Sequence, residues 1–220
     1  MKTYPTQYLD GMTHFPESPD DFIGGARQAA QDMKRTIEKS KARGFTPIKL
    51  MYAGNAGIGK TALTYYAQKL MNVSKWALVN INGTDVDINM IRDWNTSIHY
   101  CHDTTHGDYR LWCIHESDKM PVLAQVGFLS LMDKLPNRTA VICTTNITIG
   151  TGDKVERERF QTRFKYTEIL PPEPPELAQF LISKFEIPES VASEIAMSVN
   201  GNVRAACLEA EEWMDTQETN

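Results

Sequence analysis

The chain has 220 residues, of which 41% are hydrophobic, 23% charged and 9% aromatic, the composition of an ordinary globular protein. Its formal net charge of −5 and sequence pI near 5.6 exclude bulk attraction to nucleic acid, so any DNA contact must come from a local basic surface, supplied by several subunits together. No apolar run is long enough to cross a membrane, and residues 1–5 contain no signal-peptide core.

The first predicted elements are an arm and a helix. Residues 1–20 are polar and interrupted by prolines, so they are expected to form an N-terminal arm. Residues 25–43 predict a helix, because apolar side chains recur along one face. The opposite face is basic and is interpreted as a solvated helix face, with a DNA or partner surface as the alternative. Its basic residues are Lys34, Arg35, Lys39, Lys41 and Arg43.

Residues 54–61 have the complete pattern Gly-x-x-x-x-Gly-Lys-Thr of a phosphate-binding loop. A strand is predicted before it, at 48–53, and a helix after it, at 62–70, which is the context that this motif requires. Glycines let backbone N–H groups surround phosphate oxygens, and the helix N-terminus points at the same anion. Lys60 is expected to reach the β- and γ-phosphates, and the Thr61 hydroxyl to ligate Mg²⁺. The residues expected to contact the nucleotide here are Asn55, Ala56, Gly57, Ile58, Gly59, Lys60, Thr61 and Ala62.

Strands and helices then alternate along the chain. Further strands are predicted at 76–81, 110–116, 139–146 and 168–170, and helices at 86–99 and 122–134. This alternation predicts a parallel sheet of five strands covered by helices on both faces. Ligands of such sheets bind at the carboxyl ends of the strands, so the polar strand ends are expected to converge on the phosphate-binding loop.

The clearest boundary is the proline-rich connector at 171–175, whose stiffness excludes a helix. Three helices are predicted after it, at 176–185, 189–199 and 202–214, too few for a large independent core. They are interpreted as a small helical lid. The predicted divisions are an arm at 1–20, an α/β domain at 21–171, an all-α lid at 172–215 and a tail at 216–220.

Two strand ends carry candidate residues for hydrolysis. Glu116 ends the third predicted strand and is the candidate for polarising the attacking water and for a place in the Mg²⁺ site. Asn146 ends the fourth, where its amide could hydrogen-bond the water or the γ-phosphate.

Taken in order, these motifs resemble those of AAA+ ATPases of the clamp-loader and replication-initiator group, over residues 20–214. Residues 21–25, with Phe-Ile-Gly, resemble the segment that packs by the adenine in that family, which implies that Ile23 and Gly24 contact the nucleotide. Residues 80–85 resemble the Asn-(Gly/Ala)-Ser-Asp stretch after the second strand of clamp-loader ATPases. The implied fold is a P-loop NTPase sheet followed by a helical lid.

The resemblance also implies roles for several residues. Asn146 falls at the family's first sensor position, and residues 200–206 resemble the lid segment that places Arg204 at the second sensor position. Phe-Gln-Thr-Arg-Phe at 160–164 resembles the box that carries the arginine finger, so Arg163, with Arg159 as the alternative, would reach a neighbouring subunit's γ-phosphate. Active sites shared between subunits of a homo-oligomer, in a ring or spiral, would follow.

One departure from the family pattern concerns hydrolysis. The family normally carries Asp where this chain has His115, and a neutral imidazole brings no negative charge to the waters around Mg²⁺. ATP could then act mainly as an assembly switch, Asp118 could partly substitute, or His115 could be tolerated because Thr61 and the phosphates supply the direct ligands. Weak but real hydrolysis is the favoured interpretation.

A second departure is length, because the collar of clamp loaders and the DNA-binding domain of initiators are both missing from this sequence. We therefore expect a nearly bare AAA+ module, with a phage or plasmid origin considered, that binds ATP and Mg²⁺ and acts on DNA replication or recombination machinery. The alternative is a nucleotide-gated scaffold that hardly hydrolyses and recruits a partner protein. A protein-remodelling ATPase ranks last, because residues 86–108 contain no convincing aromatic pore-loop motif.

The cysteines bear on compartment and metal binding. Cys113 and Cys143 lie in apolar runs and predict buried, reduced thiols, which favours the cytoplasm. A separate group of residues matches no common zinc spacing and is interpreted as a polar loop and not as a metal site. This group contains His99, Cys101, His102 and His106.

Overall fold

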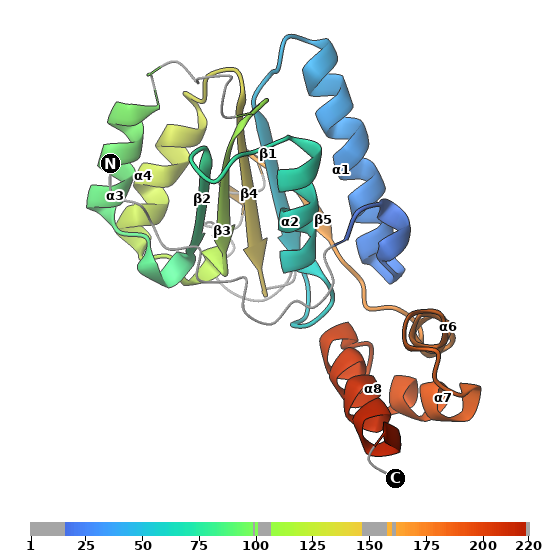
Figure 1. Ribbon diagram of the computed structural model, residues 1–220. Helices are drawn as coiled ribbons and strands as arrows, with labels where there is room; N and C mark the ends of the chain where they lie inside the picture. The colour runs from blue at the N-terminus through green and yellow to red at the C-terminus, as the bar shows by residue number, and fades with distance from the viewer. Residues whose placement is uncertain (1–15, 99, 101–106, 147–157, 160–161, 219–220) are drawn as a thin grey trace.

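The computed structural model describes residues 16–98, 100, 107–146, 158–159 and 162–218. Its centre is a sheet of five parallel strands in the order β2-β3-β4-β1-β5 (Figure 1). The strands are β1 (Ile48–Ala53), β2 (Leu78–Asn82), β3 (Arg110–His115), β4 (Thr139–Thr145) and β5 (Lys165–Glu168). The predicted parallel five-stranded sheet is therefore confirmed.

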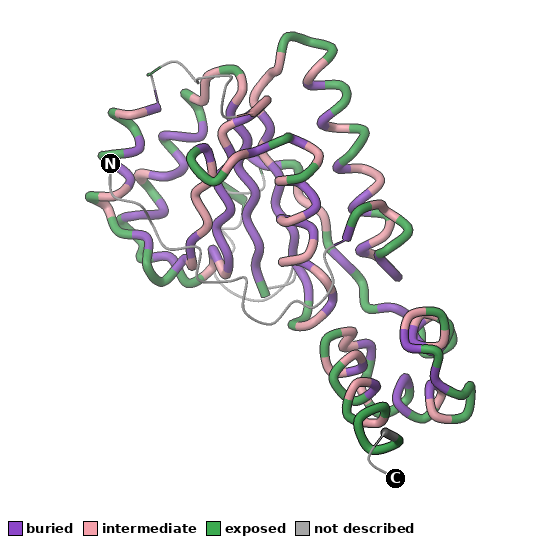
Figure 2. The backbone as a smooth tube through the Cα atoms, viewed as in Figure 1, coloured by how far each residue is buried: buried purple, intermediate pink, exposed green. Residues whose placement is uncertain are grey.

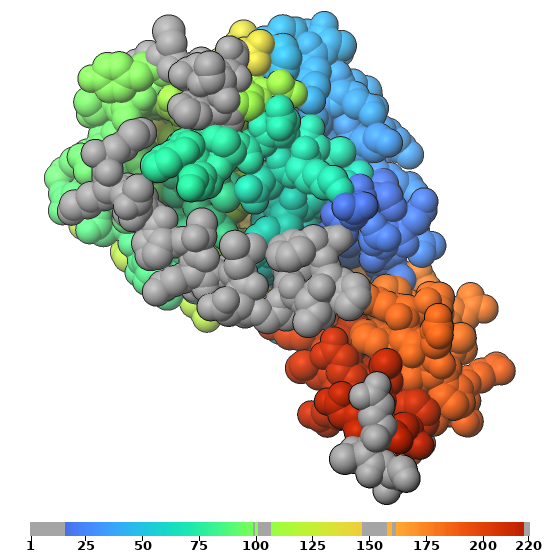
Figure 3. All heavy atoms as spheres, in the orientation of Figure 1, coloured from blue at the N-terminus to red at the C-terminus, as the bar shows by residue number. Residues whose placement is uncertain are grey.

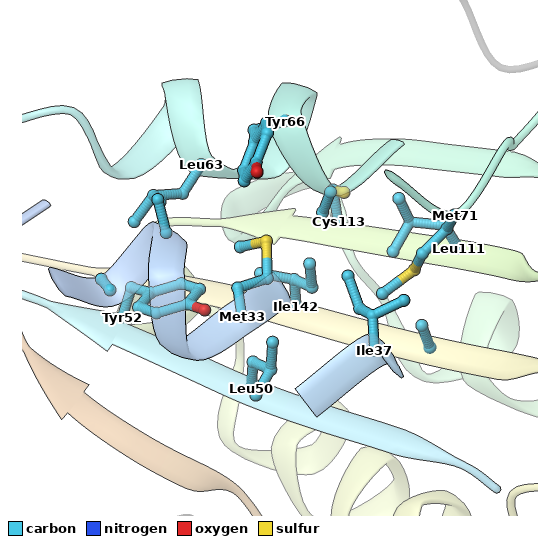
Figure 4. Packing of buried hydrophobic residues seen from close by; sticks show 14 of the residues in the cluster. Met33, Ile37, Leu50, Tyr52, Leu63, Tyr66, Met71, Leu111, Cys113 and Ile142 are labelled. Atoms are coloured by element: carbon cyan, nitrogen blue, oxygen red, sulfur yellow. The ribbon is translucent and has the colours of Figure 1, made fainter. Parts of the chain in front are cut away.

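Helices cover both faces of this sheet. Helices α1 (Gly24–Ala42) and α2 (Lys60–Leu70) pack on one face, and α3 (Ile88–Ser97) and α4 (Val122–Met132) on the other. Alternate residues of β1 supply the two cores, since Leu50 faces α1 and α2 while Met51 faces α3 and α4. Figure 4 shows the first core, where Met33, Ile37, Leu63 and Tyr66 lie over the strands.

The chain ends in three helices with a core of their own. They are α6 (Pro174–Phe185), α7 (Glu189–Ser198) and α8 (Val203–Glu218). Their buried side chains form a separate hydrophobic cluster, which Ile23 joins from the segment before α1. In Figure 3 these helices project from one corner of the α/β part, so the expected all-α lid is present.

The fifth strand was predicted at residues 168–170, but the structure places it at Lys165–Glu168. β5 lies at the edge of the sheet and is half exposed, so polar residues are tolerated there and its sequence lacks a buried strand's apolar run. Ile169 is buried beyond the strand, where its carbonyl oxygen lies against Gly54. The apolar signal therefore marks a core residue just after the strand and not the strand itself.

The central strands of the sheet are mostly buried, between the two helical layers (Figure 2). β1, β3 and β4 are buried along nearly their whole length, which agrees with their uninterrupted apolar runs. Cys113 and Cys143 are buried free thiols, as predicted, and burial raises the pKa of Cys113 to about 12. Within the described residues, every helix is too short or too polar to span a bilayer.

Candidate functional site

The loop between β1 and α2 holds its shape through three glycines with positive φ. Gly54, Gly57 and Gly59 have φ of 144°, 79° and 95°, a region that side chains disfavour. A Cβ on Gly54 would also lie 2.5 Å from the carbonyl oxygen of Ile169. Gly59 caps α2, so the unpaired N–H groups of the helix N-terminus face the loop. This backbone fits a phosphate group.

Lys60 is folded into this loop. Its ammonium donates to the carbonyl oxygens of Gly54 and Asn55, at 2.7 and 2.5 Å, and the residue is only 8% exposed. Burial and, after it, the charge of Arg204 lower the pKa of Lys60 to about 8, against the opposing charges of Asp118 and Glu116. A buried positive charge beside the glycine backbone favours an anionic ligand.

The first turn of α8 lies directly on the loop. The backbone N–H of Arg204 donates to the carbonyl oxygen of Gly57 at 3.1 Å. Asn202 accepts a hydrogen bond from the N–H of Ala205 and thereby caps α8, and the same side chain touches Gly57. The sequence identified Arg204 but missed Asn202, although a cap residue before a helix was a usable signal.

The contact between Gly57 and Asn202 can be tested with a matched pair of glycines. Gly57 and Gly44 share a φ of 79°, but a Cβ would overlap Asn202 Oδ1 at Gly57 and meet nothing within 4 Å at Gly44. Gly44→Ala is expected to cost about 1 kcal/mol of unfolding free energy from backbone strain alone. Gly57→Ala should cost about 1–3 kcal/mol more, because of the steric overlap.

Urea denaturation of both variants measures this difference. Adding Asn202→Ala should relieve the extra cost of Gly57→Ala but leave Gly44→Ala unchanged. Equal destabilisation by the two glycine variants would contradict the contact.

Two strand ends bring the acidic side of the site together. Glu116 has a left-handed backbone (φ 49°), and its carboxylate pairs with Lys119 at 2.5 Å. That hydrogen bond is the main reason why the pKa of Glu116 is lowered, and a hydrogen bond with Asn146 adds to it. The N–H of Asn146 donates to Oδ1 of Asp118 at 3.4 Å. Asn146, Glu116 and Asp118 are therefore neighbours at the carboxyl ends of β3 and β4.

His115 is the last residue of β3, directly before Glu116, and is 6% exposed. Its Nε2 is 2.7 Å from Oδ1 of Asn80 on β2. Burial lowers the pKa of His115 from 6.5 to about 4, although Glu116 opposes the shift, so the imidazole is neutral at pH 7. The negative charge at this end of β3 therefore comes from Glu116 and Asp118.

The buried imidazole makes stability depend on pH. In the unfolded chain His115 takes up a proton near pH 6.5, but in the folded protein only near pH 4. The unfolded state binds more protons in this window, so stability should fall by up to about 3 kcal/mol between pH 6.5 and 4. Urea denaturation at pH 7 and 4.5 checks this. His115→Gln should lose measurably less stability over the same range, and equal losses would contradict the assignment.

The two candidate arginine fingers lie elsewhere. Arg163 donates three hydrogen bonds of 3.1 to 3.2 Å to the carboxylate of Asp133, just after α4. Arg159 is exposed, and its carbonyl oxygen accepts from Arg163 at 3.3 Å. Because Lys165 pairs with Leu50 in parallel register, Arg163 lies near the amino end of β1, and the phosphate-binding loop follows the carboxyl end. About six strand residues, or roughly 20 Å, separate the two levels.

Ile23 and Gly24 lie where the lid meets the α/β part. Ile23 is buried in the lid cluster, and the N–H of Gly24 donates to Oε1 of Glu176 on α6 at 2.8 Å. Within the loop, Asn55 and Ala56 are exposed, whereas Ile58 is buried in the core. The structure thus brings the loop, the strand ends and Arg204 together, and it places Arg159 and Arg163 apart from them.

The described residues fit a metal ion that phosphates and water also ligate. No group of three His, Cys, Asp or Glu side chains in the described part of the chain could hold a metal ion. A Mg²⁺ ion bound through one or two protein groups, phosphates and water remains compatible with Thr61 and Glu116. His99, Cys101, His102 and His106, interpreted as a polar loop, lie outside the described residues.

Comparison with known proteins supports the fold. No family model matches the sequence, and no curated protein matches it significantly. Solved structures of RuvB from Thermotoga maritima do match. One single-substitution variant has a TM-score of 0.71 at 17% identity, covering 93% of this chain and 67% of RuvB. A second variant has a TM-score of 0.70 at 18% identity, covering 94% and 68%.

A third match is the Thermotoga maritima RuvB Holliday junction branch migration motor, with a TM-score of 0.67 at 18% identity, covering 91% of this chain and 65% of that one. The chain thus spans about two thirds of the length of these structures. At this identity the likeness concerns the fold. The fold that this chain shares with them is a parallel five-stranded sheet with a phosphate-binding loop after β1, flanked by helices and followed by an all-α lid.

Proposed function

We propose that this protein binds ATP together with Mg²⁺ and hydrolyses it slowly, as one subunit of a homo-oligomer. The observation that carries the proposal is the convergence of opposite charges on one glycine loop. Lys60 and the lid residue Arg204 bring positive charge to the loop, and the carboxylates of Glu116 and Asp118 lie close enough for their charges to act on Lys60. The negative phosphates of a nucleoside triphosphate would match the two cations, and its metal ion would match the carboxylates.

Each residue has a role that its position supports. Lys60 neutralises phosphate charge, and Thr61 at the start of α2 supplies a hydroxyl for the metal. Glu116 polarises the attacking water, and Asn146, hydrogen-bonded to it, orients that water. Arg204 couples the lid to the nucleotide, because its backbone is bonded to the loop at Gly57.

The position of Arg163 supports the proposal of a shared site. It lies roughly 20 Å along the sheet from the level of its own loop, too far to neutralise a phosphate bound there. We infer that Arg163, with Arg159 as the alternative, acts on the nucleotide of a neighbouring subunit in a ring or spiral.

We further propose that the oligomer acts on DNA replication or recombination machinery, in the manner of a clamp loader or helicase loader. The likeness to a branch migration motor supports a DNA-related role. The lid is unsuited to DNA, because its helices carry many carboxylates against only Lys184 and Arg204. The exposed basic residues on α1, such as Lys34 and Lys39, are the better DNA surface.

A second candidate is a nucleotide-gated scaffold that recruits a partner and hardly hydrolyses. The neutral His115 favours it, because one carboxylate expected near the metal waters is missing. The ion pair between Glu116 and Lys119 also favours the scaffold, because the carboxylate proposed to polarise water is already paired with an ammonium group. Both candidates require ATP binding, and they differ in turnover.

Single-turnover hydrolysis, with and without DNA, separates the two candidates. Native mass measurement with a non-hydrolysable ATP analogue tests assembly. We expect ATP-dependent oligomers and slow hydrolysis above the level of a Lys60→Ala control. Oligomers without hydrolysis would establish the scaffold. A chain that stays monomeric under all conditions would refute the shared site.

A further inference from the structure

A chain of three polar side chains connects α2 to the strand end behind the acidic group. Nε2 of His115 lies 2.7 Å from Oδ1 of Asn80, and the hydroxyl of Tyr65 hydrogen-bonds the same Asn80 side chain. The parallel register sets Asn80 opposite Cys113 and Asn82 opposite His115. Asn80 and His115 therefore project from the same sheet face, the one that α2 covers above Cys113 (Figure 4).

The direction of these hydrogen bonds follows from the chemistry of the amide. Asn80 has one accepting end and one donating end. Oδ1 of Asn80 faces Nε2 of His115 at 2.7 Å, which leaves Nδ2 as the end that donates to the phenol oxygen of Tyr65. Because Oδ1 can only accept, Nε2 of His115 must carry the proton.

We propose that Tyr65 and Asn80 are positioning residues that hold His115 in the Nε2–H tautomer. Nδ1 is then the accepting nitrogen of the neutral imidazole. His115 brings no negative charge to this strand end, where the family in the resemblance has a carboxylate. Metal-free ATP should therefore be tolerated better than it would be beside an Asp. This last consequence rests on the proposed ATP binding.

The tautomer can be measured on the full chain without nucleotide. Long-range ¹H–¹⁵N correlation of the imidazole should show a protonated Nε2 and an unprotonated Nδ1 in the wild type. Tyr65→Phe removes the hydroxyl that orients Asn80 and should give a mixture of tautomers, and Asn80→Ala should do so more strongly. The matched control is Tyr66→Phe, since Tyr66 is on the same helix but packs on Phe22. A protonated Nδ1 in the wild type, or spectra unchanged in both Tyr65→Phe and Asn80→Ala, would overturn the proposal.

The charge consequence is measured by ATP titration with Mg²⁺ and with excess chelator. His115→Asp should raise the ratio of the chelator Kd to the Mg²⁺ Kd by about tenfold, the size expected for one added charge at a partly screened distance. His115→Asn, a neutral acceptor, should keep the wild-type ratio and is the matched control. An equal ratio for His115→Asp and wild type would refute the charge argument.

The two readouts separate this inference from the proposed function. If no form of the protein binds ATP while the tautomer behaves as stated, the proposed function fails and the positioning role stands. If ATP binds but the tautomer does not respond to Tyr65→Phe and Asn80→Ala, the positioning role fails alone.

Discussion

Lys60→Ala is expected to weaken ATP binding by about 100-fold or more, the largest single effect on binding. Hydrogen bonds to charged groups contribute roughly 1.5–3 kcal/mol each, and Lys60 is the buried cation of the loop, bonded to the carbonyl oxygens of Gly54 and Asn55. A loss of about 3 kcal/mol is a factor of more than 100 in Kd. Calorimetric or fluorescence titration with ATP and Mg²⁺ measures it.

The matched control is Lys69→Ala. Lys69 lies on the same helix, but it is half exposed and pairs with Glu17 on the surface. The Lys69→Ala variant should bind ATP with the affinity of the wild type. Equal affinities for the Lys60→Ala variant and the wild type would show that the loop does not hold the nucleotide.

Arg163→Ala is expected to reduce hydrolysis by about 1,000-fold while leaving ATP affinity nearly unchanged. An arginine supplied by a neighbouring subunit typically contributes a factor of 10³ to 10⁵ to phosphoryl transfer, because it stabilises charge that develops in the transition state. The substitution also removes the ion pair with Asp133, but that pair is partly exposed and contributes little to stability. Single-turnover hydrolysis by the assembled protein gives the rate.

Mixing two inactive variants distinguishes a shared site from a site within one subunit. Lys60→Ala subunits keep Arg163, and Arg163→Ala subunits keep an intact loop. Mixed oligomers therefore contain some interfaces with both groups, and partial activity should return. No recovery in oligomers shown to be mixed would argue against a finger acting between subunits. A loss of rate in Arg159→Ala, but not in Arg163→Ala, would move the finger to Arg159.

The sequence predicted the elements whose signal is local. β1, β3 and β4 are buried on both faces, so uninterrupted apolar runs reveal them. The phosphate-binding loop was predictable because its glycine spacing is read together with the strand before it and the helix after it. β5 was misplaced because an exposed edge strand does not need the apolar pattern that identifies a strand.

Only the tertiary structure decided which residues meet across long separations in the chain. Asn202 lies on Gly57, Asn80 hydrogen-bonds His115, and Asp133 pairs with Arg163. Local periodicity reports which face of an element is buried, but it contains no information on which polar group lies opposite another. The sequence by itself therefore determined the fold class and the phosphate-binding loop. The packing of the lid and the pairing of the strands decided the surroundings of that loop, because hydrogen bonds and charges act only at the short distances that folding creates.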